Sequence, residues 1–206
     1  MRHMTYRGAR IVWVLLAVLP MVVAGCGTSK PSQLYLLRSL RESEAGVSIT
    51  ADKIGPAVLI GPVTLPAYLN RTQVVTLAGD HEVVVDEVTR WAEPLQENFS
   101  RVLVENLSVL LNTPEVYAFD RRASTPVDFQ VIIDVTRFDT DAEGGAYLTA
   151  FWRVVGKDSK APSIKRKSVF HVAASSPGIT QVLEAQNRTL TEFSRELAKA
   201  IQSLPR

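Results

Sequence analysis

Apolar side chains occupy every second position in two stretches in the second half of the chain, residues 129–136 and 148–154. This period of two is typical of strands that turn one face toward a core. The polar residues between them, 139–145, end in Gly144-Gly145 and predict the tip of an antiparallel hairpin. A third strand is expected at 164–173, before the turn residues Ser176-Pro177-Gly178.

The third strand contains the one marked basic cluster, Lys165-Arg166-Lys167. We expect the stems of these side chains to lie on the sheet while their charges reach water. The alternative is a contact with anionic lipid or with a partner protein.

Apolar residues recur at intervals of three and four in two other stretches, which predicts two helices that each bury one face. The first begins at Leu95 and ends near Asn112, with Pro94 in its first turn and Glu93 at its positive end. The second covers residues 179–203. Some of its leucines are seven residues apart, but the run is too short for a coiled coil, so we expect it to dock on the sheet.

Shorter apolar segments in the first half of the chain predict strands at 33–37, 57–65 and 115–119 and a polar loop at 38–53. A hairpin formed by residues 73–77 and 82–86 is expected around the turn residues Ala78-Gly79-Asp80. The whole pattern predicts one domain of the α/β (α+β) class. Its mixed, largely antiparallel sheet would carry two main helices on it.

The N-terminus has the pattern of a bacterial lipoprotein signal. Three arginines precede an apolar run from Ile11 to Val22, and Val23-Ala24-Gly25-Cys26 forms a lipobox. The run is too short and wrongly flanked for a stable membrane span. We expect residues 1–25 to be removed, Cys26 to carry acyl chains, residues 26–32 to form a tether and residues 33–206 to fold. An unlipidated signal peptide and an anchor helix are the alternatives.

The residue after the predicted lipidation site is Gly27 rather than Asp. In Gram-negative bacteria, Asp at this position favours retention in the inner membrane, so Gly27 favours transfer to the outer membrane. We therefore expect a lipid-anchored protein of the outer membrane that faces the periplasm.

Removal of the signal changes the charge balance. The whole chain has 23 basic and 21 acidic residues; three arginines leave with residues 1–25, so the mature chain has 20 against 21, a formal charge of −1. A nearly neutral domain lacks the electrostatic footprint of a nucleic-acid-binding protein. Cys26 is the only cysteine, so the mature domain has neither a disulfide nor a cysteine nucleophile.

The sequence shows no constellation of catalytic residues, metal ligands or phosphate-binding glycines. His81 and His171 are the only histidines outside the signal, and neither has a second His nearby. Residues 139–144 resemble the start of a calcium loop, but its twelfth position, which needs a bidentate Glu, is Ala150. We therefore expect no catalytic residues, no metal and no cofactor.

Four Asn-x-Ser/Thr triplets match the glycosylation pattern, and two of them begin at Asn98 and Asn106 inside the first predicted helix. Because the lipobox indicates a bacterial cell, none of the four is expected to be modified.

Two segments rich in proline, arginine and aromatic residues are not explained by the strand and helix pattern. They are residues 61–71, Gly-Pro-Val-Thr-Leu-Pro-Ala-Tyr-Leu-Asn-Arg, and residues 90–95, Arg-Trp-Ala-Glu-Pro-Leu. In an architectural role, Pro66 ends a strand, Tyr68 and Trp91 cover the core, and Arg71 or Arg90 pairs with Glu93 ahead of Pro94.

The same residue types also anchor protein interfaces, where Trp, Tyr and Arg are enriched. We favour the architectural role for Trp91 and leave both roles open for Tyr68 and Arg71. Tyr68, Leu69 and Arg71 are therefore the candidates for a partner interface.

Taken together, these features resemble the PqiC family of ABC-type transport auxiliary lipoproteins, which are associated with MCE-domain intermembrane transport systems. The resemblance rests on the lipobox, on residues 61–71 and 90–95, and on a hairpin of the Phe-x3-Gly-Gly-x2-Leu-x-Ala-x-Trp kind. It covers essentially the whole chain from Cys26. The chain departs from the family in Asn70, where an acidic residue is common, and in a hairpin tip lengthened by residues 138–143.

The resemblance implies a non-enzymatic lipoprotein that docks with a periplasm-spanning MCE-domain protein, acts beside ABC transporter subunits and helps to move lipids between membranes. Family members self-associate, so a homo-oligomer is also implied. Two other readings remain open from the residues alone. One is a lipoprotein hydrolase acting on envelope lipid or cell wall, and the other is a structural lipoprotein that binds peptidoglycan.

Overall fold

A strand of 13 residues, β6 (Phe129–Asp141), lies at the centre of the mixed sheet in this computed structural model. Along one edge it pairs antiparallel with β7 (Gly145–Gly156), which in turn pairs antiparallel with β8 (Ile164–Ala173). Along its other edge it pairs in parallel with β2 (Val58–Thr64) and, near its end, with β3 (Gln73–Ala78). Because β6 is longer than either partner, one edge accommodates both strands.

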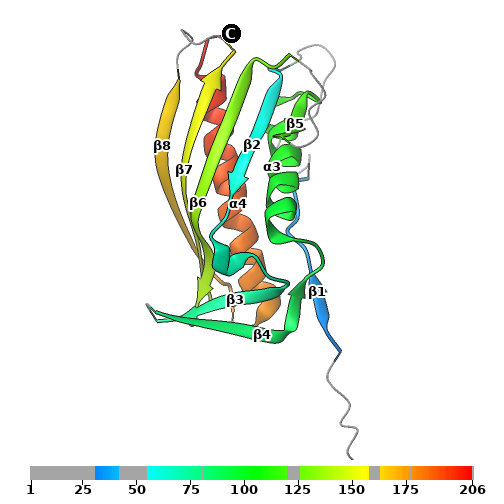
Figure 1. Cartoon of the computed structure of the whole chain (residues 1–206), viewed down its shortest axis with the longest axis vertical. Coiled ribbons are helices and arrows are strands. Elements are labelled where there is room, and N and C mark those ends of the chain that lie inside the picture. Colours follow the sequence, from blue (N-terminus) through cyan, green and yellow to red (C-terminus); the bar gives the residue numbers. More distant parts are fainter. Residues whose placement is uncertain are drawn as a thin grey trace, which may run out of the picture. The chain divides into compact units, whose positions relative to one another are not determined.

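Three further strands extend this arrangement. β5 (Val116–Ala118) pairs in parallel with β2, and β4 (Glu82–Trp91) forms an antiparallel hairpin with β3. β1 (Gln33–Tyr35) pairs in parallel with the end of β4. In Figure 1 the β3–β4 hairpin crosses one end of the sheet, and β1 lies beside it. The N-terminal strand and the hairpin therefore share one end of the fold.

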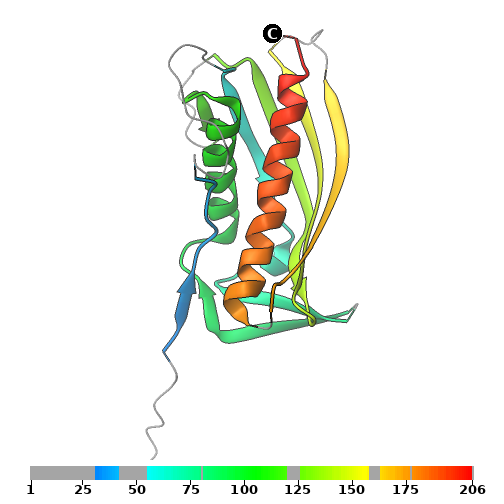
Figure 2. The same ribbon diagram turned by 180° about the vertical axis from the view of Figure 1, so that it is seen from behind.

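Both helices cover the same face of the sheet, as Figures 1 and 2 show from opposite sides. α4 (Ile179–Gln202) packs on β7 and β8, and α3 (Leu95–Leu111) packs beside α4 and against β2 and β5. α3 ends at Asn112, whose left-handed backbone (φ 52°) is one that Asn tolerates better than most residues. This docking of α4 on the sheet confirms the sequence prediction.

Aromatic side chains fill the layer between the helices and the sheet. Phe99 of α3 meets Phe138 of β6 edge to face, with ring centroids 5.1 Å apart, and Phe193 of α4 meets Trp152 of β7 at 6.4 Å. The buried Trp152 indole N–H donates to the Ser168 hydroxyl oxygen at 2.8 Å, so its one polar group has a partner. Alternate positions of β6 and β7 supply this core, as the period of two predicted.

The hairpin tip differs from the prediction of a polar loop at residues 139–145. β6 continues to Asp141, β7 begins at Gly145, and only Ala142, Glu143 and Gly144 form the turn. Asp139, expected at an exposed tip, is fully buried. Its carboxylate remains in the sheet because neighbouring side chains bind both of its oxygens.

The structure describes residues 31–41, 55–79, 81–119, 126–157, 163–176 and 178–205. Within the described ranges, the residues from Ser32 onward form one compact unit. The predicted signal, Cys26 and most of the loop predicted at 38–53 lie outside the described residues. In the part that is described, no helix is long and apolar enough to span a membrane.

Candidate functional site

The segment that follows the predicted tether is attached to α3 by a buried asparagine. Residues 36–41 run along α3 after β1 has ended (Figure 2). Asn98 Oδ1 accepts a hydrogen bond from the Leu37 N–H at 2.7 Å, and Asn98 Nδ2 donates to the Leu37 carbonyl at 3.4 Å. The side-chain amide thus gives Leu37 the backbone partners that no neighbouring strand provides, while the Leu37 side chain enters the core.

A second asparagine, Asn106, links the same segment to both helices. Its Oδ1 accepts from the Leu40 N–H at 2.7 Å, and its Nδ2 donates to the Ser194 hydroxyl oxygen of α4 at 2.9 Å. On α4, Asn187 Oδ1 accepts from the Arg38 N–H at 2.9 Å. We call residues 36–41 the strap. The strap is therefore hydrogen-bonded to α3 and to α4.

The predicted interface residues of segment 61–71 differ from one another in burial. Pro66 follows the end of β2 and precedes a short 3-10 helix, η1 (Ala67–Leu69). Tyr68 is partly buried, Arg71 is exposed, and Leu69 lies in the core. Of the three candidates, only Tyr68 and Arg71 therefore present side-chain surface to a partner, and their interface role stays a prediction.

A network of side chains holds η1 to the sheet. The Tyr68 hydroxyl donates to Asp139 Oδ2 at 2.6 Å, and Arg137 Nε donates to Asp139 Oδ1 at 2.8 Å. Burial, followed by this hydrogen bond to Asp139, raises the pKa of Tyr68. The Arg137 guanidinium lies 3.7 Å from the centre of the Tyr147 ring, which stacks on His171 at 4.3 Å. The network thus extends from η1 across three strands.

Residues 90–95 join the N-terminal segment, the hairpin and α3. Trp91 is buried, and its N–H donates at 2.7 Å to the carbonyl of Thr72, the residue that follows segment 61–71. The next N–H, of Ala92, donates to the Tyr35 carbonyl at 2.9 Å. Pro94 precedes the first residue of α3. This turn therefore connects β1 directly to the helix that carries Asn98.

Glu93 pairs with Arg101, and not with Arg71 or Arg90 as the sequence suggested. The Glu93 Oε1 to Arg101 NH2 distance is 2.7 Å, while Arg90 forms its ion pair within β4. Arg101 lies two turns along α3 and also contacts Glu105 at 3.1 Å, one turn further. The hydrogen bond to Glu93 is the main cause of the raised pKa of Arg101. This acid–base–acid row stays at the surface of the helix.

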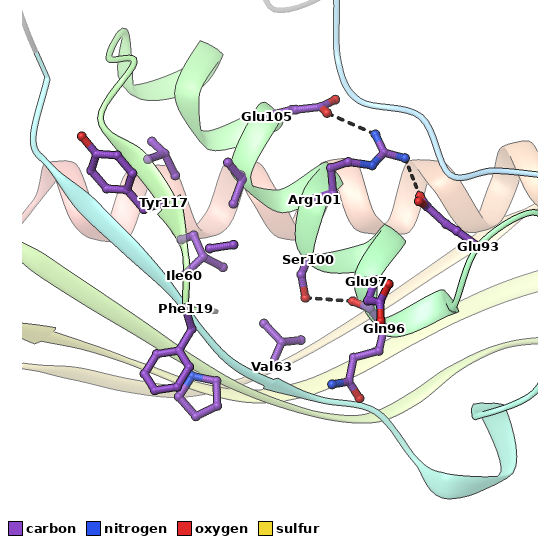
Figure 3. Close-up of a pocket in the computed structure, with 14 residues that line it drawn as sticks. Ile60, Val63, Glu93, Gln96, Glu97, Ser100, Arg101, Glu105, Tyr117 and Phe119 are labelled. Atoms are coloured by element: carbon purple, nitrogen blue, oxygen red, sulfur yellow. Dashed lines mark hydrogen bonds and ion pairs between the residues drawn. The ribbon is translucent and has the colours of Figure 1, made fainter. Parts of the chain in front are cut away.

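A groove of about 640 Å³ lies between α3 and the edge formed by β2 and β5 (Figure 3). Its apolar lining comes from both walls and includes Ile60, Val63, Val104, Val116 and Phe119. Its polar residues come mainly from α3 and the turn before it, where Arg101 bridges Glu93 and Glu105 in Figure 3. The volume suits a peptide segment or a small ligand.

The acidic and imidazole groups of the described residues are not clustered as metal ligands. Within those ranges, no three His, Cys, Asp or Glu side chains are grouped so as to hold a metal ion. The carboxylate of Asp141, part of the calcium-like sequence, accepts the Gly145 N–H at 2.5 Å. His81 is exposed beside the turn of the β3–β4 hairpin.

The sequence analysis does not predict the strap bonds, because it treats Asn98 and Asn106 only as parts of glycosylation triplets. A signal was present nonetheless. Both asparagines lie on the apolar face of the predicted helix, and both are fully buried in the structure. Asn is a poor residue for a helix interior, so two amides within one apolar stripe indicate that a backbone segment from elsewhere is bound there.

Comparison with known proteins identifies the class to which this fold belongs. The family model described as "ABC-type transport auxiliary lipoprotein component" matches residues 35–198, from β1 to near the end of α4. The chain belongs to this family.

Two individual relatives share one name. The Escherichia coli protein "Intermembrane transport lipoprotein PqiC" is 22% identical over 191 residues, which cover 93% of this chain and 98% of the relative, and the Shigella flexneri protein of that name matches equally. The similarity therefore extends over nearly the full length of both relatives.

Two solved structures share the fold. An uncharacterized protein has a TM-score of 0.65 and 21% identity, covering 84% of this chain and 99% of that one. A Xanthomonas campestris protein has a TM-score of 0.62 and 16% identity, covering 81% and 93%. At these identities the structures bear on the fold alone.

Proposed function

We propose that the protein is an outer-membrane lipoprotein that faces the periplasm and serves as a non-enzymatic auxiliary component of an ABC- and MCE-type lipid transport system, contributing to envelope integrity. The observation that carries this proposal is the family match over residues 35–198. The relatives named as intermembrane transport lipoproteins support it, because they align over almost their entire length.

In this proposal, acylated Cys26 fixes the domain to the membrane. Gly27 to Ser32 is six residues long and spans at most about 20 Å, so the end of the fold that carries β1 stays close to the bilayer. The strap then transfers the attachment to both helices through Asn98, Asn106 and Asn187. Anchoring keeps the domain at a high effective concentration for a partner that arrives from the other membrane.

The partners in this proposal are an MCE-domain protein, the subunits of an ABC transporter and further copies of the chain. Tyr68 and Arg71 are candidate contact residues, since both present surface on the segment before β3, whose Gln73 pairs with Arg90 of β4, the strand that β1 joins. The proposal gives Asp139 and Tyr68 a structural role, since the partly buried Tyr68 donates to the buried Asp139.

Purification from detergent-solubilised membranes tests this function. Permease, ATPase and MCE-domain subunits should copurify with the tagged native chain, and copurification should fall for a Tyr68→Ala/Arg71→Ala variant that remains folded. The matched control is Arg188→Ala, an exposed arginine on α4. Recovery of peptidoglycan fragments in place of transport subunits would favour the structural lipoprotein, and turnover of a lipid or cell-wall substrate would favour the hydrolase.

A further inference from the structure

We propose that the groove between α3 and the β2–β5 edge binds an apolar segment of a partner protein that carries Lys or Arg beside its apolar side chains. This inference rests on the proposed function, because it gives the chemistry of a docking partner. The argument has three parts, namely an unfinished sheet edge, an exposed apolar residue at that edge and an acidic rim.

The sheet edge at the groove is incomplete. β5 pairs with β2 only from Val58 to Ile60, and β2 continues for four more residues. No strand in the described ranges pairs with residues 61–64 on that side. Pro62 lacks an N–H, and the register shifts between Ile60 and Val63, so this edge is a poor template for an added strand. Recognition here therefore depends on side chains.

Phe119 marks the apolar end of the groove. It follows β5 directly, and 53% of its surface is exposed. Burying a Phe side chain is favourable because it removes a large apolar area from water. In Figure 3 its ring lies at the end of the groove beyond Ile60 and Val63. An apolar side chain from a partner would cover this ring and continue the apolar lining toward Val104.

The rim of the groove is acidic. The charged residues that line the groove are Glu93, Glu97, Glu105 and Arg101, which together carry a formal charge of −2. Arg101 is already bound by Glu93 and Glu105, whereas Glu97 is exposed and forms no ion pair within the described residues. A partner with Lys or Arg beside its apolar residues matches this charge, and one with Asp or Glu is repelled.

The sheet face away from the helices carries a second exposed apolar surface, which has basic neighbours in place of acidic ones. There the exposed Phe151 and Val169 neighbour Lys167, whose ammonium group lies 5.4 Å from the centre of the Phe151 ring. Charge complementarity therefore directs a basic apolar segment to the α3 groove and not to this second apolar surface.

A photo-crosslinking experiment on the full-length lipoprotein in detergent tests the proposal. The probe is a synthetic decapeptide with a central benzoylphenylalanine, flanking leucines and two lysines at each end. The control peptide has glutamates in place of the lysines. Crosslinks of the lysine peptide should map to residues 93–105 and 116–119, and the glutamate peptide should give few. No other transport subunit is present, so the outcome is independent of whether such subunits copurify.

Two substitutions separate charge from apolar contact. Glu97→Lys should weaken binding of the lysine peptide by about fivefold, as expected for reversal of one exposed charge. Phe119→Ser should weaken binding without changing the charge. Their matched controls are Glu184→Lys on α4 and Val169→Ser on β8, both exposed, which should leave binding unchanged.

Three results would overturn the proposal. The first is equal crosslinking by the two peptides, and the second is crosslinks that map to the Phe151–Val169 surface. The third is a change of self-association in the Glu97 and Phe119 variants, measured by sedimentation, without any peptide crosslink in the groove, because the occupant would then be a second copy of the chain.

Discussion

Replacing Asn98 with alanine removes one of the two side-chain attachments between the strap and α3, the other being Asn106, and measures how much Asn98 contributes. The substitution leaves the Leu37 N–H and carbonyl without their partner in a buried position. A buried backbone group without a partner costs about 1–3 kcal/mol. Since the Leu37 carbonyl bond is long, at 3.4 Å, we expect a total loss of about 2–3 kcal/mol.

Two measurements can detect this loss of stability. Urea unfolding monitored by tryptophan fluorescence gives the change in the free energy of unfolding, and hydrogen exchange gives the local effect at the Leu37 amide. A loss of 2–3 kcal/mol corresponds to an exchange rate raised by about 30- to 150-fold if the strap opens locally.

Asn187→Ala is the matched control for Asn98→Ala. Asn187 also binds the strap through one backbone N–H, at Arg38, but at an exposed position. Water can replace this bond, so the expected loss is only about 0.5–1 kcal/mol. If Asn98→Ala cost no more than Asn187→Ala and left Leu37 exchange unchanged, the reasoning on buried amide clamps would be refuted.

Two further substitutions probe the end of the sheet. Tyr68→Phe removes the hydroxyl bound to Asp139 and should cost about 1–2 kcal/mol in urea unfolding at neutral pH. The pKa of Tyr68 is raised in the folded state, whereas tyrosine in the unfolded chain ionises at about pH 10. The free energy of unfolding of the wild type should therefore fall as pH rises above about 10, and that of Tyr68→Phe should fall less. Equal losses in the two proteins would contradict this. Gly145→Ala places a Cβ 2.5 Å from Asp141 Oδ2, so the turn must shift, and the melting temperature should fall by several degrees in calorimetry; an unchanged value would show that the Asp141 side chain moves freely.

The period-two pattern located the strands whose side chains alternate between core and solvent. β8 has the bounds that were predicted, 164–173, and α4 ends one residue before the predicted end. α4 buries one regular face, so its periodicity carries the necessary information. β8 buries Ser168 and exposes Val169, so its bounds do not follow from an apolar period of two. The mixed sheet with two helices on one face confirms the predicted class.

The remaining features depend on contacts between distant parts of the chain. Asp139 looked like a loop residue because a lone carboxylate is rarely buried, and only the fold brings Tyr68 to it. The parallel pairing of β2 with β6 joins segments about 70 residues apart and leaves no local signature. Glu93 was assigned to a nearby arginine in sequence, whereas helical geometry gives it Arg101.

The asparagines that bind the strap illustrate a limit of residue patterns in the sequence. Asn98 and Asn106 match a modification motif, but they also lie on the apolar face of a helix. Their partners, Leu37 and Leu40, lie more than 60 residues away, in a stretch read mostly as loop. Sequence could identify the unusual amides but not the backbone groups that they bind.

Intact-mass analysis of the mature N-terminus tests the central claim most directly. The account predicts a chain that begins at Cys26 and carries a diacylglyceryl group and an N-acyl chain, and that leaves the membrane fraction when Cys26 is replaced by Ala. An unmodified Cys26 thiol, or a mature chain that begins at another residue, would contradict it.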